Sequence, residues 1–299
     1  MALDIKPLHP LFAAEVNDVD LSDPDTDAHY PDFQAAIDQY GVLVFHGPPL
    51  SQERQIAFCS LFGTLEGEGK NVGVIQTGIQ RRLETRLADI SNLDEGGKVL
   101  GQQDRRRMFA LGNQLWHTDS SFKAIPAKYS MLHAHSVTPE GGETQFADTR
   151  AAWDELPEPM KDRVRDLVAE HSIFCSRAKL GFTDFSDDER AALPPVHRPI
   201  VRHHPGSERN ALYLASHADR ILGLEVPDGK MLIRELMEHM TQPHLIHTHT
   251  WAVGDLVIWD NRCTLHRGRP YDEAKYRRDL RRGTVEDDDP AMIHQFAAE

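Results

Sequence analysis

Residues 112–122 read GNQLWHTDSSF, and this stretch sets an imidazole, His117, two residues before a carboxylate, Asp119. In a β-strand or its direct extension, residues i and i+2 point to the same face, so the two side chains can reach one metal ion. Far downstream, the run WDNRCTLHRG at residues 259–268 offers a second imidazole, His266, in an equally apolar setting. The three side chains are therefore a candidate metal site.

The donor set of this candidate site favours iron. Two imidazole nitrogens and one carboxylate oxygen form the facial triad of non-haem Fe(II) oxygenases, which leaves coordination positions open. Cys263 is an alternative ligand, but a thiolate favours zinc or copper. Because the chain has 17 histidines, His117 has a second interpretation, a histidine satisfied by a neighbouring carboxylate. Six further histidines are expected to be strand or loop residues: His133, His135, His203, His204, His247 and His249.

Composition limits the partners of the protein. Of the 299 residues, 40% are hydrophobic and 27% are charged, as is usual for a globular domain. The formal net charge of −14 would repel nucleic acid and anionic membranes. The chain shows neither an 18-residue apolar run nor the pattern of a signal peptide, and its three cysteines are widely spaced. We expect a cytoplasmic protein with reduced thiols.

The hydrophobic pattern predicts one mainly β domain over residues 1–299, a sandwich or barrel with helical insertions. Helices are expected at 51–63, 160–171 and 229–241. Glycines and charges alternate without a period over 66–107, which predicts an active-site loop or lid. The acidic end, 286–299, is expected to fray. Extended segments are expected at 3–20, 41–47, 129–137, 143–147, 199–203, 211–216, 247–253, 255–260 and 278–285.

Arginines cluster shortly after His266, in the run RRDLRRGT at residues 277–284. On a strand, Arg278 and Arg282 share one face and the other two arginines share the opposite face. Guanidiniums that point into a pocket need anionic partners, and their planar fork suits a carboxylate. The alternative is a solvated basic strand paired with surface acids.

At this point the chain resembles a known family, the Fe(II)/2-oxoglutarate-dependent dioxygenases of the taurine dioxygenase and 2,4-dichlorophenoxyacetate dioxygenase group. The stretches that carry the resemblance are LHPLFAA at 8–14, LSQ at 50–52, NQLWH at 113–117 and WDNRC at 259–263. They are most similar to the phenoxyacetate branch and extend over nearly the whole chain. The resemblance implies a double-stranded β-helix, or jelly roll, with the metal near one open end.

Site residues follow from the resemblance, motif by motif. His117, Asp119 and His266 would hold Fe(II). Thr144, in the turn GGET, and Arg278 would bind the distal carboxylate of the cosubstrate 2-oxoglutarate. These two positions complete the expected cosubstrate site.

The substrate site is implied in the same way. Arg282 would meet the acidic group of the primary substrate, and Asn113 would line its pocket. The stretch between His266 and the arginine run carries one residue more than the family pattern, so a shifted register would put Arg277 and Arg281 in place of Arg278 and Arg282. In the early loop, Lys70 lies one position away from a substrate-binding lysine of the phenoxyacetate branch, and Asn71 takes the matching position.

The activity implied is hydroxylation of a small anionic aromatic substrate, a phenoxyalkanoic acid, next to its ether oxygen. This reaction would use O₂ and 2-oxoglutarate, release succinate, CO₂, a phenol and glyoxylate or a related keto acid, and be stimulated by ascorbate. The alternatives are a taurine, alkylsulfonate or sulfate-ester dioxygenase, a zinc-dependent hydrolase with the same ligands, and a jelly-roll binding protein without activity. A homo-oligomer is expected by analogy with related folds.

Overall fold

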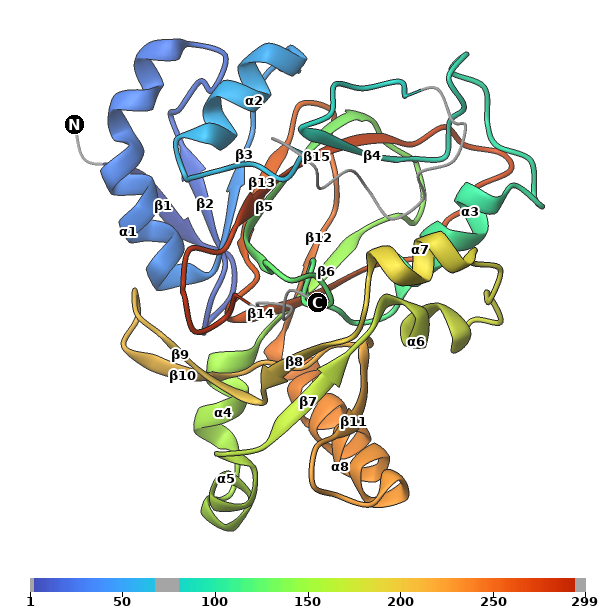
Figure 1. The fold of residues 1–299 in the computed structure, drawn as a ribbon. Coiled ribbons are helices and arrows are strands. Elements are labelled where there is room, and N and C mark those ends of the chain that lie inside the picture. The colour runs from blue at the N-terminus through green and yellow to red at the C-terminus, as the bar shows by residue number, and fades with distance from the viewer. Residues whose placement is uncertain (1–2, 68–80, 294–299) are drawn as a thin grey trace.

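The computed structural model describes residues 3–67 and 81–293. Its largest element is a seven-stranded sheet in the order β1-β2-β3-β13-β5-β15-β4 (Figure 1). All neighbouring strands of this sheet run antiparallel except β2 and β3, which are parallel. The strands are β1 Asp4–Pro7, β2 Ala14–Asn17, β3 Val42–Phe45, β4 Leu87–Ser91, β5 Ala127–Ser136, β13 Leu256–Asp260 and β15 Asp279–Glu286.

A second, three-stranded sheet in the order β12-β6-β14 faces the first. Its strands are β6 Thr144–Asp148, β12 Ile246–His249 and β14 Thr264–Gly268. Apolar side chains from both sheets fill the space between them, with Val257, Trp259 and Leu132 from the large sheet packing against Phe146 from the small one. Two such sheets around one core are the jelly roll, and the expected double-stranded β-helix is confirmed.

Helices α1, Tyr30–Tyr40, and α2, Gln52–Ser60, cover one outer face of the large sheet. Phe33 of α1 and Phe58 of α2 make edge-on contacts with Phe45 of β3, in a core that is separate from the interior of the roll. The Ser51 hydroxyl accepts a hydrogen bond from the Arg54 N–H and caps α2, which explains why the predicted helix begins there.

A further layer follows the small sheet (Figure 1). Helix α8, Val226–Met240, and helix α4, Thr149–Glu155, share a core with β7 and β11. The remaining strands are β7 Val168–His171, β8 Val196–Pro199, β9 Val201–His204, β10 Arg209–Leu212 and β11 Ala218–Ile221. The remaining helices are η1 Pro24–His29, α3 Arg105–Ala110, η2 Leu111–Gln114, α5 Glu158–Val164, α6 Ile173–Ala178, α7 Asp187–Ala192 and η3 Pro243–Leu245.

Two internal segments differ from the sequence-based expectation. The helix expected over 160–171 is wrong beyond Val164, because Val168–His171 is strand β7 between β8 and β11. Within 66–107, Leu87–Ser91 forms β4, which pairs with β15 at the edge of the large sheet. In both places distant strands supply the backbone partners, and a local apolar pattern cannot reveal them.

The acidic end does not fray as far as residue 293. Asp287 is 3% exposed and its carboxylate lies 2.7 Å from Nη1 of the buried Arg202, while Met292 is also 3% exposed. The segment is held because a buried carboxylate and a buried guanidinium offset each other's desolvation. In the described part of the chain, none of the helices is long and apolar enough to cross a membrane.

Candidate active site

His117, Asp119 and His266 converge at one end of the roll. One ligand atom from each, an imidazole nitrogen or a carboxylate oxygen, lies within 4.8 Å of the others, and all three residues are buried. His266 projects from β14, and His117 forms a backbone bridge to it just before the chain turns at Asp119. The Nε2 atoms of His117 and His266 lie 3.9 and 3.5 Å from the carboxylate oxygens of Asp119.

The protonation state of the histidines suits a metal ion. Nδ1–H of His117 donates to the Leu115 carbonyl at 2.7 Å, which leaves Nε2 with a free lone pair directed at the cluster. Burial lowers the pKa of His117 and of His266, although the Asp119 charge opposes this shift at both rings. Neutral imidazoles are the form that binds a metal, so the donor set fits a divalent ion of the iron type.

Asp119 is held by hydrogen bonds around it. Its backbone N–H donates to Oδ1 of Asn261 at 3.0 Å, and its Oδ2 accepts from the Ser130 hydroxyl at 2.7 Å. Burial raises the pKa of Asp119, but the charge of Arg282 outweighs burial, aided by the neighbouring imidazoles and the Ser130 hydrogen bond, and the net pKa is well below the usual value. The carboxylate is therefore ionised and oriented before any ion arrives.

A cavity of about 120 Å³ opens on one side of the ligands. Thr144, His117, His266 and Arg278 line it. The Thr144 hydroxyl accepts a 3.0 Å hydrogen bond from Nε1 of Trp251, and one guanidinium nitrogen of Arg278 donates to the Gly142 carbonyl at 3.1 Å. Burial lowers the pKa of Arg278, and no described carboxylate forms an ion pair with it. This cavity can accept a ligand with a carboxylate at its far end.

Gly142 lets the guanidinium of Arg278 come close to the backbone of the turn. Its φ is +75°, and a Cβ at this position would lie 3.3 Å from Nε of Arg278. Gly141, with φ +70°, precedes it, so the Gly-Gly turn expected before β6 brings the backbone against the arginine.

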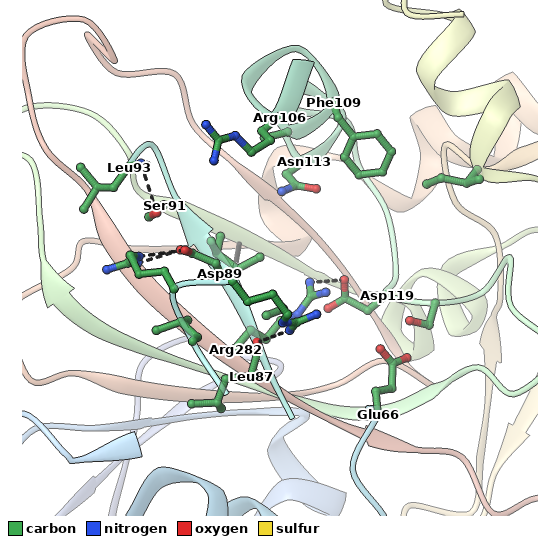
Figure 2. Close-up of a pocket in the computed structure, with 18 of the residues that line it drawn as sticks. Glu66, Leu87, Asp89, Ser91, Leu93, Arg106, Phe109, Asn113, Asp119 and Arg282 are labelled. Carbon is green, nitrogen blue, oxygen red and sulfur yellow. Dashed lines mark hydrogen bonds and ion pairs between the residues drawn. The ribbon is translucent and has the colours of Figure 1, made fainter. Parts of the chain in front are cut away.

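A larger cavity, of about 350 Å³, opens on the other side. Arg282 points into both cavities and forms a close ion pair with Asp119 (Figure 2). Phe109 and Asn113 lie on the facing wall in the same view. The larger cavity is also lined by Leu83, Leu93, Phe122, Ile173 and His217. It combines apolar walls with a cation close to the metal ligands.

The residues predicted to bind substrate and cosubstrate can be located relative to the two cavities. Arg278 and Arg282 face the cavities, whereas Arg277 is exposed and Arg281 interacts with Asp279 on the opposite face. The register assumed from the sequence is thus the one observed. Asn113 lines both cavities, and Lys70 lies outside the described residues.

Cys263 belongs to a different cluster from His266. It lies with His204 and Asp260, and burial raises the pKa of its thiol well above the usual value. Asp260 already receives hydrogen bonds from Arg262 and accepts a 2.9 Å contact from His204. This cluster is explained as a satisfied ion-pair network, and a thiol that stays protonated is a poor metal ligand.

Sequence reasoning missed several lining residues. Arg177 of α6 and His217 border the larger cavity, and Asp89, Ile90 and Ser91 of β4 border both cavities. An arginine inside the otherwise apolar run IFCSRA was the available signal for Arg177. No comparable local pattern marks His217.

A jelly roll with two histidines and one aspartate at its open end defines the class of non-haem, metal-dependent oxygenases. The model of the family described as "Taurine catabolism dioxygenase TauD, TfdA family" matches residues 4–284, and the chain belongs to this family. Membership makes it a 2-oxoglutarate-dependent dioxygenase, and the resemblance inferred from the sequence is confirmed.

Three comparisons illustrate the similarity. The chain is 48% identical to an alpha-ketoglutarate-dependent 2,4-dichlorophenoxyacetate dioxygenase of Cupriavidus pinatubonensis, over 96% of this chain and 99% of the relative. It is 39% identical to an (S)-phenoxypropionate/alpha-ketoglutarate-dioxygenase of Sphingobium herbicidovorans, over 92% of each chain. A crystal structure of AAD-2 in complex with Mn(II) and N-oxalylglycine matches with a TM-score of 0.91 and 44% identity, covering 96% of this chain and 98% of that one.

Proposed function

We propose that the protein hydroxylates phenoxyalkanoic acids, compounds like 2,4-dichlorophenoxyacetate, on the carbon next to the ether oxygen. The observation that carries this proposal is the pair of cavities that meet at Asn113, His117 and Arg282, beside Asp119. The smaller cavity suits 2-oxoglutarate, and the larger one offers apolar walls for an aromatic ring with Arg282 for its carboxylate. The 48% identity to a 2,4-dichlorophenoxyacetate dioxygenase supports the same substrate class.

His117, Asp119 and His266 would hold Fe(II). Bound there with 2-oxoglutarate, the ion would supply the oxidant that places one atom of O₂ in a substrate C–H bond while 2-oxoglutarate becomes succinate and CO₂. Arg278 and Thr144 would fix the distal carboxylate of 2-oxoglutarate through charge-assisted hydrogen bonds. In this arrangement His117, Asp119 and His266 would position the ion, and the residues of the cavity walls would position 2-oxoglutarate and the substrate.

Substrate placement is the task of Arg282 and of the apolar walls. A carboxylate bound to Arg282 puts the neighbouring carbon of an aryloxyacetate next to the metal ligands, since this arginine already contacts Asp119. Leu83, Phe109 and Phe122 would enclose the ring and exclude water. Hydroxylation beside the ether oxygen gives a hemiacetal, which breaks down to a phenol and glyoxylate.

The segment 66–107 is proposed to close over the substrate. Its described part contributes Glu66, Leu83 and β4 to the wall of the larger cavity, and Arg82 ties it to the sheet through ion pairs of 2.8 Å to Asp89 and 2.7 Å to Asp279. Contact between Lys70 and the substrate stays a prediction.

The decisive experiment is a substrate panel assayed with Fe(II), ascorbate and 2-oxoglutarate, in which succinate and phenol are measured separately. Phenol and succinate in equal amounts from phenoxyacetates are expected. Succinate without phenol would reject the ether substrate and keep the dioxygenase class, and sulfite from taurine or release of sulfate from hexyl sulfate would favour the sulfonate or sulfate-ester alternative. Full turnover with Zn(II) in place of Fe(II) would indicate a hydrolase.

A further inference from the structure

Arg177 places a second guanidinium in the wall of the larger cavity. It is 4% exposed and lies on α6, beside His117, Asp119 and Arg282 in the cavity lining. Its hydrogen bond to another side chain is from Nη1 to the Ser176 hydroxyl at 3.0 Å, and its Nε has no partner among the described residues. No described carboxylate forms an ion pair with it, and the nearby Asp119 pairs with Arg282 instead.

The guanidinium of Arg177 is held in a narrow slot formed by Phe109 and Gly112. One face lies over the ring of Phe109, with the guanidinium carbon 4.3 Å from the ring centroid. The guanidinium also lies against Gly112, where an added Cβ would come within 2.1 Å of the same carbon. A flat cation between an aromatic ring and a glycine keeps its edge, and hence its N–H groups, directed along the slot.

A buried cation without a counter-ion is costly, and the structure provides no other reason for one here. Burial, together with the nearby charge of Arg282, lowers the pKa of Arg177 to about 10. If the side chain served only to pack α6 against Phe109, a neutral side chain of the same length would do so without this penalty. Two guanidiniums that line one ligand cavity, of which only Arg282 is paired with a carboxylate, leave a positive site for an anion.

We propose that Arg177 is a second binding residue for the carboxylate of the primary substrate, acting together with Arg282, and that Gly112 is required because it leaves room for that guanidinium. This inference deepens the proposed function and rests on it only for the aryl ether part of the substrate. It makes Arg177 a determinant of specificity for acids over neutral molecules of the same shape.

The test uses two ligands of matched shape, phenoxyacetate and the uncharged 2-phenoxyethanol. Binding is measured by calorimetry on the full-length protein loaded with Zn(II) and 2-oxoglutarate, which does not turn over. For Arg177→Met, which keeps the length of the side chain, the Kd for phenoxyacetate is expected to rise about 10- to 100-fold, and the Kd for 2-phenoxyethanol about 2-fold or less, since a charged hydrogen bond is lost only for the acid.

Two further variants make the test independent of one substitution. Gly112→Ala should weaken phenoxyacetate binding in the same selective way by displacing the guanidinium, whereas Gly47→Ala, away from both cavities and where a Cβ meets nothing within 4 Å, should have no effect. Arg177→Lys, which keeps the charge, should lose less affinity than Arg177→Met. Equal weakening of the acid and the alcohol, or unchanged binding of the acid, would show that Arg177 is only structural.

Hexanoate is added as a probe that has the carboxylate without the aryl ether. If the wild-type protein binds hexanoate in an Arg177-dependent way and fails to bind phenoxyacetate, the substrate class proposed above is wrong while the role of Arg177 stands. If it binds none of these anions, the role of Arg177 is refuted.

Discussion

His117 and His266 exchange two backbone hydrogen bonds, from His117 N–H to the His266 carbonyl at 3.0 Å and from His266 N–H to the His117 carbonyl at 2.8 Å. This bridge brings the two imidazoles together, with ring centroids 4.1 Å apart. A ligand pair fixed by backbone needs little reorganisation when the metal binds. The third residue, Asp119, is held instead by hydrogen bonds to the side chains of Asn261 and Ser130.

We predict that Asn261→Ala weakens metal binding. The Asn261 amide accepts from the Asp119 N–H at 3.0 Å and donates to Ser130 Oγ at 3.0 Å, so its loss frees both the backbone and the carboxylate of Asp119. Loss of such a supporting hydrogen bond typically reduces metal affinity about 10- to 100-fold. Titration of the protein with Mn(II) would measure this, with Asn17→Ala as a surface control, and an unchanged affinity would mean that Asn261 does not position the ligand.

Arg278 and Arg282 should have separable roles. Arg282→Leu is expected to raise the KM for the primary substrate more than that for 2-oxoglutarate, and Arg278→Leu should do the reverse, with changes of about 10- to 100-fold because each loses a charged hydrogen bond. The exposed neighbour Arg277→Leu is the matched control. Since Arg282 also contacts Asp119, Mn(II) affinity is measured for each variant. The opposite pattern of KM values would show that the two roles are exchanged.

Thr144→Val should impair cosubstrate binding. The Thr144 hydroxyl accepts from Trp251 Nε1, so its own hydrogen is available to a carboxylate in the smaller cavity. Valine keeps the shape and removes the donor, which should raise the KM for 2-oxoglutarate about 10-fold, while Thr144→Ser retains most of the affinity. An equal rise of the KM for 2-oxoglutarate in the valine and serine variants would indicate that the methyl group of Thr144 acts through packing instead.

The convergence of His117, Asp119 and His266 into a candidate metal site was predictable from sequence because their residue types and the flanking motifs are distinctive. Arg278 and Arg282 were predicted to share one face from their spacing, and both line the smaller cavity, although β15 begins only at Asp279 and its pairing with β5 is irregular between Asp279 and Leu280. The role of Arg177 could not be predicted, because it depends on contacts with Phe109 and Gly112 that only the fold creates. For the same reason Val168–His171 was predicted as helix. This segment forms a strand because it pairs with β8 and β11, and no local sequence pattern indicates that pairing.

His133, expected from the sequence to be a strand residue and not a ligand, should make folding stability depend on pH. It lies in β5, fully buried, where its Nε2 accepts from the Leu50 N–H at 2.8 Å and its Nδ1–H donates to the Asp255 carbonyl at 3.0 Å. Both ring nitrogens are thus satisfied only in the neutral form. Burial, with the nearby His135 and Arg281, lowers the pKa of His133 to about 4.

The direction of the effect follows from this lowered pKa. Between pH 6.5 and about 4, the unfolded chain binds a proton at His133 that the folded protein does not, so unfolding is favoured as the pH falls. One such group contributes about 1.4 kcal/mol of unfolding free energy per pH unit within this window, and nothing above it. The free energy of unfolding can be measured by urea denaturation of the wild type and of His133→Gln from pH 7 to pH 5. As the pH falls, this free energy should decrease less steeply for the variant than for the wild type. Other buried histidines titrate equally in both proteins, so parallel curves would mean that His133 is protonated in the folded state at little cost.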